Sequence, residues 1–264
     1  MAPAYDTTPR LKGRIAVVTG AGQGIGAGIA EAFCRAGASV VIAERNPATG
    51  AAKAAVLSDA GYPAHFVETD VADPDAITAM AAETDRVFGP MDILVNNAGI
   101  NVAHEPMELT KEEWDRCMSV DLEGVWNCSR AALERMLPRE RGAIVNIASV
   151  HSFRIIPDFV PYNVAKHGVV GITRALGIQY AARGVRVNAI APGYILTEIV
   201  EEWWARFDDP LAERQRAEAL HPCKRIGTPE EIAMTAVFLA SDEARFLNAE
   251  TIRVDGGRSL LFHD

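Results

Sequence analysis

The stretch Thr19-Gly20-Ala21-Gly22-Gln23-Gly24-Ile25-Gly26 is the part of the sequence that predicts the fold most strongly. A run rich in Ile, Ala and Val precedes it, and an apolar helical pattern follows it. Glycines permit a tight turn and let backbone amides approach a phosphate, while the start of a helix adds positive potential. A strand, a glycine-rich turn and a helix in this order indicate a phosphate-binding loop, with Gly20, Gln23, Gly24, Ile25 and Gly26 as its contact residues.

Strand-like and helix-like segments alternate along the chain. The predicted strands cover residues 14–19, 39–44, 64–69, 92–96, 142–148, 185–190 and 251–254, and the predicted helices cover residues 24–36, 47–60, 74–88, 110–137, 161–181 and 229–240. Most of the strands are unbroken apolar runs, which are typical of strands covered on both faces. The alternation predicts an α/β fold with a doubly wound, seven-stranded parallel sheet and helices on both faces.

No linker, repeat or low-complexity tract divides the chain, so residues 1–264 are predicted to form a single domain with a core of about residues 10–259. Thr110 and Thr228 are each followed three residues later by glutamate, which is the pattern of a helix capping box. Residues 192–222 break the alternation and are expected to form one or two irregularly joined helices. This insertion follows the end of a strand, where open α/β sheets bind ligands, so we expect it to help form a ligand site.

The composition excludes several functional classes. With 26 Lys+Arg and 35 Asp+Glu, the net charge is −9, which argues against nucleic acid or an anionic membrane as a partner. No apolar run reaches the length of a membrane span, and residues 1–14 lack the apolar segment of a secretory signal. The four cysteines are far apart, so neither a zinc site nor a disulfide scaffold is indicated, and we expect a cytoplasmic protein.

The second predicted strand ends in Glu44, at roughly the spacing from the glycine loop expected for an acid that accepts hydrogen bonds from an adenosine ribose. A carboxylate at this place would repel a 2′-phosphate, which favours NAD as the cofactor. The next residue, Arg45, could pair with such a phosphate, so NADP stays an alternative.

A second group of residues has the pattern of an acid–base site. Tyr162 and Lys166 are four residues apart and share one face of a predicted helix. A free phenol has a pKa of about 10, and a neighbouring cation lowers it, so Tyr162 could take a proton from a carbinol while hydride leaves to a nicotinamide. Ser149 follows the end of a predicted strand, where its hydroxyl could hold the substrate oxygen. This mechanism requires no metal.

These motifs, in this order, resemble those of the short-chain dehydrogenase/reductase family, over nearly the whole chain. The resemblance rests on Thr19–Gly26, Asp70-Val71, Asn96-Asn97-Ala98-Gly99, Ser149, Tyr162 with Lys166, Asn188, and Pro192-Gly193 followed by Thr197. It implies a Rossmann-type fold, a homotetramer, and Lys166 as a ligand of the nicotinamide ribose. It also implies cofactor contacts from Asp70, Val71, Asn97, Ala98, Gly99, Pro192, Gly193, Ile195 and Thr197.

The chain departs from the family pattern at Asp121, where most members have asparagine. The resemblance implies that the backbone carbonyl at this position holds a relay water, which aspartate would also allow. A carboxylate near Lys166 would alter the coupled titration of the site. We therefore include Asp121 among the predicted catalytic residues.

Substrate contacts are expected from strand ends and from the insertion. The candidates are Ser149, Asn101, His151, Tyr194 and Trp203. Adjacent residues on a helix point about 100° apart, so only one of Trp203 and Trp204 is expected to face the pocket. His151 is equally compatible with a structural role.

The expected activity is NAD(P)-dependent oxidation of a carbinol. Around Ser149 and the insertion, the chain resembles the sugar and polyol dehydrogenases of the family, which suggests an aldose 1-dehydrogenase that oxidises L-arabinose, L-fucose or D-galactose to the lactone. The alternatives are a 3-oxoacyl carrier-protein reductase and a secondary-alcohol or polyol dehydrogenase. A cofactor-binding module without catalysis is a remote alternative, because such proteins commonly lack the Tyr or the Lys.

Overall fold

The computed structural model describes residues 9–261, and the predicted strands and helices alternate throughout that range. The seven strands form one sheet in the order β3-β2-β1-β4-β5-β6-β7, and every neighbouring pair is parallel. The strands are β1 (Ile15–Thr19), β2 (Ser39–Glu44), β3 (Ala64–Glu68), β4 (Ile93–Asn96), β5 (Gly142–Ile147), β6 (Val185–Pro192) and β7 (Thr251–Val254). The predicted Rossmann-type sheet is therefore confirmed.

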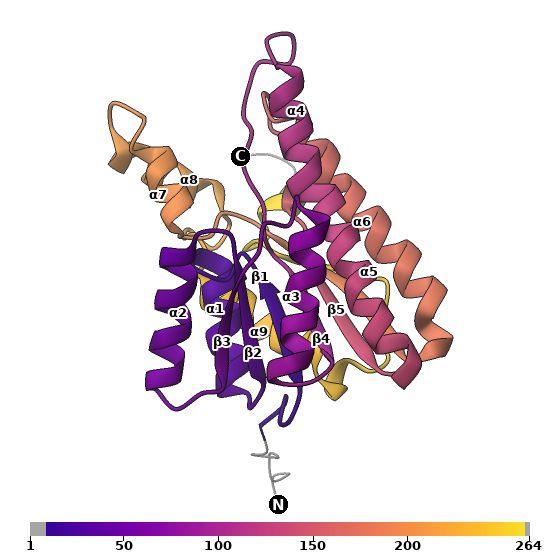
Figure 1. The fold of residues 1–264 in the computed structure, drawn as a ribbon. Helices are drawn as coiled ribbons and strands as arrows, with labels where there is room; N and C mark the ends of the chain where they lie inside the picture. Colours follow the sequence, from indigo (N-terminus) through magenta and orange to yellow (C-terminus); the bar gives the residue numbers. More distant parts are fainter. Residues whose placement is uncertain (1–8, 262–264) are drawn as a thin grey trace, which may run out of the picture.

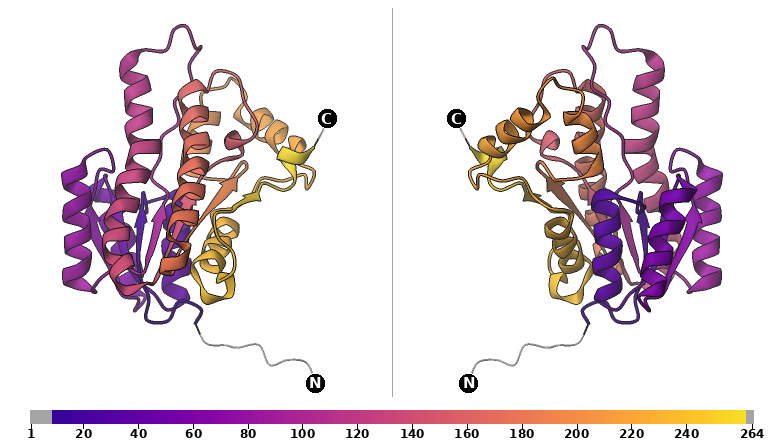
Figure 2. Two further views of the ribbon diagram at one scale, coloured as in Figure 1. Left: turned by 90° about the vertical axis from the view of Figure 1, so that its right-hand side faces the viewer. Right: turned by 90° about the vertical axis from the view of Figure 1, so that its left-hand side faces the viewer.

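Helices cover both faces of this sheet (Figures 1 and 2). One face packs against α1 (Gly24–Arg35), α2 (Pro47–Asp59) and α9 (Pro229–Ala240). The other face packs against α3 (Pro74–Val87), α5 (Gly124–Met136) and α6 (Val160–Tyr180), and α4 (Lys111–Met118) continues this layer above the sheet. Short 3₁₀ turns occupy Leu137–Arg139, Val150–Ser152, Ala181–Arg183, Asp242–Ala244 and Arg258–Leu260.

The strand sequences explain why both faces are covered. In β1, Ala16 and Val18 belong to the core beneath α1 and α9, whereas Val17 between them belongs to the core beneath α3 and α5. Successive side chains of a strand point to opposite faces, so an unbroken apolar run supplies both cores at once. The run Ala16–Val18 therefore has no polar face to turn towards water.

The chain order reverses between β1 and β4, which are neighbours although β2 and β3 lie between them in sequence. In open α/β sheets, ligands bind at the carboxyl ends of the strands beside such a reversal. The insertion forms two helices, α7 (Glu198–Trp204) and α8 (Pro210–Leu220), above this edge (Figure 1). The C-terminal turn Arg258–Leu260 lies beside them (Figure 2).

The predicted helix over residues 110–137 is wrong in one respect. Its start is as expected, because Thr110 and Glu113 form the predicted capping box, and Thr228 and Glu231 form the other one. The helix is interrupted, however, by a π-helical turn at Ser119–Glu123 between α4 and α5. Apolar periodicity gives no warning of such a turn, which is common at functional sites.

Within residues 9–261, no helix combines the length and the apolar character needed to cross a membrane. The expected single domain also includes residues 1–8 and 262–264, which lie outside the described part of the chain.

Candidate active site

The glycine loop joins β1 to α1 through backbone conformations that favour glycine. Gly20 has φ +62° and Gly24 has φ +55°, both in the left-handed region. A Cβ on Gly20 would lie 2.8 Å from the Cα of Ala98, and a Cβ on Gly26 would lie 2.1 Å from the carbonyl oxygen of Gly20. Gly20 and Gly24 line the cleft described below, whereas Gly26 does not. Gly26 is a packing residue that lets the loop fold back on the helix.

The start of α1 has the features of an anion-binding site. Its N-cap residue, Gln23, makes no side-chain hydrogen bond to the helix. The helices α5, α6 and α7 also lack such a cap, whereas α2, α3, α4, α8 and α9 are capped by the side chains of Asn46, Asp73, Thr110, Asp209 and Thr228. The first amides of α1 therefore face the cleft without a protein acceptor, as a bound pyrophosphate requires.

Asn97 and Thr19 hold the loop against the end of β4. The Nδ2 of Asn97 donates to the carbonyl oxygens of Thr19 and Gly20, both at 3.0 Å. The Oγ1 of Thr19 accepts hydrogen bonds from the amides of Asn97 and Ala98, at 3.0 and 3.1 Å. Asn97 was predicted as a cofactor contact. Its side-chain amide nitrogen is bonded to the loop, so Asn97 holds the glycine loop in position and also lines the cleft.

Glu44 closes the far end of the loop. Its Oε2 accepts from the amide of Gly22 at 3.1 Å, and its Oε1 accepts from the amide of Asn46 at 3.0 Å. The neighbouring Arg45 makes no hydrogen bond or ion pair with another described residue. Both side chains line the cleft, so the predicted acid and the potentially compensating base lie side by side.

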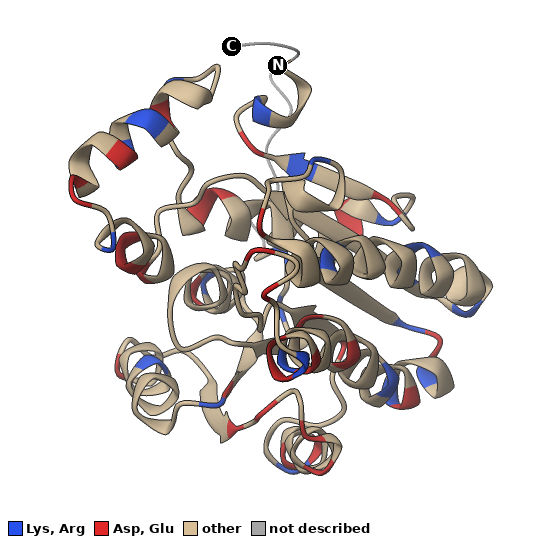
Figure 3. Ribbon diagram, turned by 90° about the horizontal axis from the view of Figure 1, so that it is seen from above, with Lys and Arg blue, Asp and Glu red and all other residues tan. Residues whose placement is uncertain are grey.

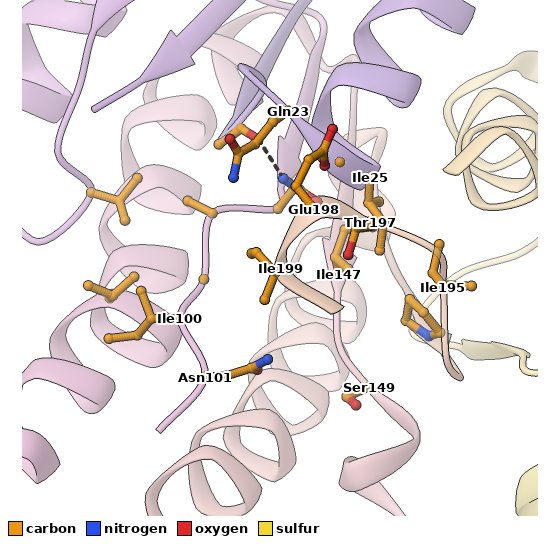
Figure 4. Close-up of a pocket in the computed structure, with 18 of the residues that line it drawn as sticks. Gln23, Ile25, Ile100, Asn101, Ile147, Ser149, Ile195, Thr197, Glu198 and Ile199 are labelled. Atoms are coloured by element: carbon orange, nitrogen blue, oxygen red, sulfur yellow. Dashed lines mark hydrogen bonds between the residues drawn. The ribbon is translucent and has the colours of Figure 1, made fainter. Parts of the chain in front are cut away.

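The cleft has a volume of about 480 Å³ and runs from the glycine loop to Ser149 (Figure 4). Apart from Gly26, every predicted cofactor residue lines it: Gly20, Gln23, Gly24, Ile25, Glu44, Asp70, Val71, Asn97, Ala98, Gly99, Tyr162, Lys166, Pro192, Gly193, Ile195 and Thr197. The side chain of Asp70 accepts from the amide of Ala72, and Asp73 caps α3. The sequence motifs therefore converge on one cavity.

Several lining residues are not among the predicted ones: Asn46, Thr49, Thr69, Val120, Ile147, Ala148, Glu198, Ile199 and Val200. Ile147 ends β5 and Ala148 follows it, so the rule that the carboxyl ends of strands face the ligand could have predicted both. Thr49 lies on α2 against Gly22, and nothing in its local sequence marks it. Glu198 begins α7 and lies beside the glycine loop (Figure 4), a position that depends on how the insertion folds back.

The predicted acid–base residues lie together at the other end of the cleft. The Nζ of Lys166 lies 5.4 Å from the centre of the Tyr162 ring and donates to the carbonyl oxygen of Ile147 at 3.2 Å. Ser149 lies beside Tyr162, and its side chain lowers the pKa of the phenol. The Oγ of Ser149 also accepts from the amide of His151 at 3.2 Å, so it caps its own turn as well as facing Tyr162.

The titration of this cluster differs from the simple expectation. Burial raises the pKa of the Tyr162 phenol, and the ammonium of Lys166 only partly opposes that rise. The sequence predicted a lowered pKa for Tyr162 from the neighbouring cation alone, and burial, which removes solvent from the phenol, has the larger effect. Burial alone would lower the pKa of Lys166, but Asp121 and Tyr162 outweigh it, so the lysine pKa is raised. Lys166 therefore stays charged while Tyr162 starts as a neutral phenol.

Asp121 is fully buried directly behind Lys166. The π-helical turn places its Oδ2 3.4 Å from the Nζ of Lys166, and its Oδ1 accepts from the amide of Ile100 at 2.8 Å. Burial raises the pKa of Asp121, whereas Lys166 and the Ile100 amide oppose the rise. Asp121 does not line the cleft, so it acts on the site through Lys166 and the backbone at Ile100.

A second cavity, of about 540 Å³, opens on the other side of Ser149 and Tyr162. All five predicted substrate residues line it: Ser149, Asn101, His151, Tyr194 and Trp203. Trp204 is buried with Ala217 and Ile226, so one tryptophan faces the cavity and the other packs in a small core, as expected. Ser149, Tyr162 and Asn101 line both cavities, which places them where the two meet.

His151 forms part of the wall beside Tyr162. Its ring meets the Tyr162 ring edge to face at 5.3 Å, and its Nδ1 donates to the Oδ1 of Asn163 at 2.7 Å. The amide nitrogen of Asn163 donates to the carbonyl oxygen of Ile156, which fixes that orientation. Burial lowers the pKa of His151, with Asn163 opposing the shift, so the ring is neutral near pH 7. Its Nε2 is then an acceptor.

A parallel sheet, an uncapped glycine-loop helix and a Ser149–Tyr162–Lys166 cluster at one edge define a dinucleotide-dependent α/β oxidoreductase. A family model described as Enoyl-(Acyl carrier protein) reductase matches residues 20–259. With the relatives described next, this match shows that the chain belongs to the short-chain dehydrogenase/reductase family. It is accordingly an oxidoreductase that acts on hydroxyl groups with NAD or NADP.

The relatives include two curated dehydrogenases. The chain is 40% identical over 252 residues to a 3beta-hydroxysteroid dehydrogenase 1 of Eggerthella lenta, covering 95% of each chain. It is 39% identical over 258 residues to a D-threitol dehydrogenase of Mycolicibacterium smegmatis, covering 97% of each.

Among solved structures, a gluconate 5-dehydrogenase from Burkholderia cenocepacia J2315, in complex with NADP and tartrate, superposes with a TM-score of 0.89. The two chains are 36% identical, and the match covers 96% of this chain and 98% of that one.

Proposed function

We propose that this chain is a sugar or polyol dehydrogenase in which Tyr162 exchanges the carbinol proton, Lys166 holds Tyr162 and the cofactor ribose, and Ser149 positions the substrate oxygen. The observation that carries the proposal is the position of Ser149 and Tyr162 at the junction of the two cavities. A group held there contacts the contents of both cavities. The bound nicotinamide would supply the hydride acceptor in the first cavity.

Four residues have separate roles in the proposed reaction. Ser149 donates to or accepts from the reacting oxygen as its charge changes. Tyr162 removes the hydroxyl proton during oxidation and returns it during reduction. Lys166 stabilises the phenolate that forms, because Asp121 and Tyr162 raise the pKa of the lysine and so favour its charged form. Asp121 keeps Lys166 charged and in place, and we propose that its backbone carbonyl holds the relay water.

We propose NAD as the preferred cofactor, held by the residues that line the first cavity. The carboxylate of Glu44 faces the place of the adenosine ribose and would repel a 2′-phosphate. Arg45 beside it supplies a positive charge that allows NADP at lower efficiency. The uncapped amides of α1 receive the pyrophosphate, and the side chains of Ile195 and Thr197 border the nicotinamide end.

The substrate proposal rests on the second cavity. Trp203, Phe159 and Tyr194 offer aromatic faces beside polar groups from Asn101 and His151, which suits the C–H face and the hydroxyls of a sugar. His151 Nε2 would accept a hydrogen bond from a substrate hydroxyl. The finer expectation, oxidation of an aldose at C1 to its lactone, belongs to this proposal, and aldoses are the first compounds to test. The D-threitol and gluconate dehydrogenases among the relatives support the broader class.

A 3-oxoacyl carrier-protein reductase is the second candidate, and the 36% identity over 250 residues to a 3-oxoacyl-[acyl-carrier-protein] reductase FabG of Chlamydia muridarum favours it. That reaction would use an acyl thioester and would be expected to prefer NADPH. Glu44 disfavours this cofactor, and the net charge of −9 disfavours docking of an acidic carrier protein.

Initial rates with NAD and NADP over a panel of aldoses, alditols, secondary alcohols and 3-oxoacyl thioesters test the proposal. Oxidation of sugars or polyols with NAD is the expected result. Activity only with 3-oxoacyl thioesters and NADPH would establish the second candidate instead. Cofactor binding without any hydride transfer would favour a non-catalytic module.

We further propose that residues 1–264 act as one cytoplasmic domain and assemble as a homotetramer through the layer that contains α5 and α6. Trp126 on α5, with Val164 and Ile178 on α6, supports this interface, because these large apolar side chains are exposed in the single chain.

A further inference from the structure

The second cavity has a charge opposite to that of the molecule. Its charged lining residues are Arg154, Arg216 and Arg258, and no aspartate or glutamate is among the described residues that line it. The chain as a whole has a net charge of −9. Figure 3 looks onto the carboxyl edge of the sheet and marks the arginine-bearing parts of α8 and of the C-terminal turn in blue. A positively charged cavity on a negatively charged protein favours binding of an anionic ligand.

We propose that this cavity binds a carboxylate of the substrate, so that the preferred substrate is a hydroxy acid whose carbinol reacts at Tyr162. The inference rests on the proposed function, because Ser149 and Tyr162 must hold the reacting carbinol at the inner end of the same cavity. It specifies the preferred substrates as the hydroxy acids derived from sugars and polyols, in place of the neutral compounds.

Arg154 is the principal candidate for the anion contact. Its Nε donates to the carbonyl oxygen of Ser259 at 2.9 Å, which anchors the guanidinium to the C-terminal turn. The two terminal nitrogens of Arg154 make no hydrogen bond or ion pair with another residue of the range 9–261. A guanidinium fixed on one edge and open on another has the geometry that binds a carboxylate through two parallel hydrogen bonds.

Arg216 and Arg258 extend this positive wall. Arg216 comes from α8, and its Nε and Nη2 donate to the Oε2 of Glu213 at 2.9 and 2.7 Å. Glu213 lies outside the lining and partly balances this charge. Arg258 belongs to the C-terminal turn, so the three arginines reach the cavity from three separate segments. Attraction of an anion therefore depends on the assembled fold, with Arg154 as its specific ligand.

Apart from the arginines and a few polar groups, the wall of the cavity is apolar and aromatic. The rings of Phe159 and Trp203 meet at 6.2 Å, and Ile155, Ile156 and Leu220 complete the surface. A substrate that spans this wall needs a carbinol at one end, an anionic group at the other and a C–H face between them. A neutral aldose would leave the terminal nitrogens of Arg154 without a charge partner, and arginine donates hydrogen bonds but accepts none.

The experiment compares matched compounds that differ only in charge: aldonates, the corresponding aldonamides and the corresponding alditols, each with NAD. We expect kcat/KM for the aldonates to exceed that for the aldonamides by at least tenfold. We also expect added salt to lower the value for the acids and to leave that for the amides unchanged, since exposed charge interactions are screened.

Substitutions of Arg154 test whether this residue causes the preference for acids. Arg154→Gln should lower the acid-to-amide ratio of kcat/KM by at least tenfold, mainly through KM, and Arg154→Lys should restore part of it. Arg174→Gln, an exposed position on α6 outside the cavity, is the matched control and should leave the ratio unchanged.

Equal turnover of acids and amides, or a ratio that Arg154→Gln leaves intact, overturns the anion site while the sugar and polyol proposal stands. Turnover of 3-oxoacyl thioesters alone overturns the proposed function and the anion site together.

Discussion

The carboxylate of Asp121 lies 3.4 Å from the ammonium of Lys166, and both groups are almost fully buried behind the reaction centre. Its charge acts on two ionisable neighbours, because Asp121 raises the pKa of Lys166 and also that of Tyr162. The carboxylate thus supports the charge of the lysine while it opposes formation of the tyrosine phenolate.

Asp121→Asn should therefore move the pH profile of oxidation. Removal of the negative charge lowers the pKa values of Tyr162 and Lys166, so the rise of kcat/KM that accompanies Tyr162 ionisation should occur at lower pH. The asparagine oxygen can still accept from the Ile100 amide, which preserves the backbone geometry. Asp115→Asn, at an exposed ion pair on α4, is the control. Superimposable pH profiles for Asp121→Asn and the wild type would contradict this role.

Tyr162→Phe should abolish most of the activity without loss of cofactor binding. It removes the group that exchanges the carbinol proton, which is worth about 10²–10⁴-fold in rate. Steady-state rates measure the loss, and fluorescence titration with NADH measures binding. Tyr180→Phe, at the other end of α6, tests whether any phenol-to-phenyl change on this helix has the same effect. Retained turnover in Tyr162→Phe would assign proton exchange to another residue.

Glu44→Ser should change the choice of cofactor. The substitution removes the charge that opposes a 2′-phosphate, so the ratio of kcat/KM with NADP to that with NAD should rise by at least about tenfold, or about 1.4 kcal/mol. Glu68→Ser is a close control, because Glu68 is the register partner of Glu44 on β3 and does not line the cleft. A cofactor ratio that is the same in Glu44→Ser and Glu68→Ser would remove Glu44 from this role.

Gly26→Ala should disrupt the glycine loop, because the added Cβ would lie 2.1 Å from the carbonyl oxygen of Gly20. We expect a lower melting temperature and weaker NADH binding. Gly171→Ala on α6 is the opposite control, since a Cβ there meets no heavy atom within 4 Å and alanine favours a helix by about 1 kcal/mol over glycine. Tolerance of Gly26→Ala, with wild-type melting and binding, would contradict the packing.

Glu231 should contribute to stability in a pH-dependent way. Its pKa is lowered from 4.5 to about 2, mainly by the hydrogen bond from Arg225 and then by the backbone amide of Thr228. A lowered carboxyl pKa stabilises the fold above the unfolded value of 4.5, and this stabilisation is lost as the pH falls towards 2. The melting temperature of Glu231→Gln should thus be lower than that of the wild type above pH 4.5 and converge with it in acid. Glu230→Gln, at the exposed neighbouring position, is the control. A difference in melting temperature between Glu231→Gln and the wild type that stays constant with pH would rule out titration of Glu231 as the cause.

The sequence was sufficient for the sheet and for most of the cleft because these features depend on local patterns. Unbroken apolar runs such as Ala16-Val17-Val18 require cover on both faces, and the order of strands and helices then determines where the strand ends meet. The spacing of the glycines predicted that Gly20 and Gly24 belong to the cofactor cleft. The four-residue spacing predicted that Tyr162 and Lys166 share one face of a helix.

Features that depend on tertiary contacts could not be predicted in this way. The bracing role of Asn97 needs β1 and β4 side by side, and the packing role of Gly26 needs the loop folded back. The pKa of Tyr162 depends on burial, which a pairwise view of Tyr162 and Lys166 omits. The arginines of the second cavity are distant in sequence, so their shared charge is visible only in the folded chain.

The π-helical turn at Ser119–Glu123 has a consequence for how related chains are compared. The wider π-helical turn changes the angular relation between the side chains of α4 and those of α5. A prediction that treats residues 110–137 as one regular helix therefore assigns the side chains of one of the two segments to the wrong face. Loss of a single residue here would restore a regular helix and rotate Asp121 away from Lys166 by about 100°. Two chains could thus share every motif and still differ in which side chain stands behind the lysine, through a change in length alone.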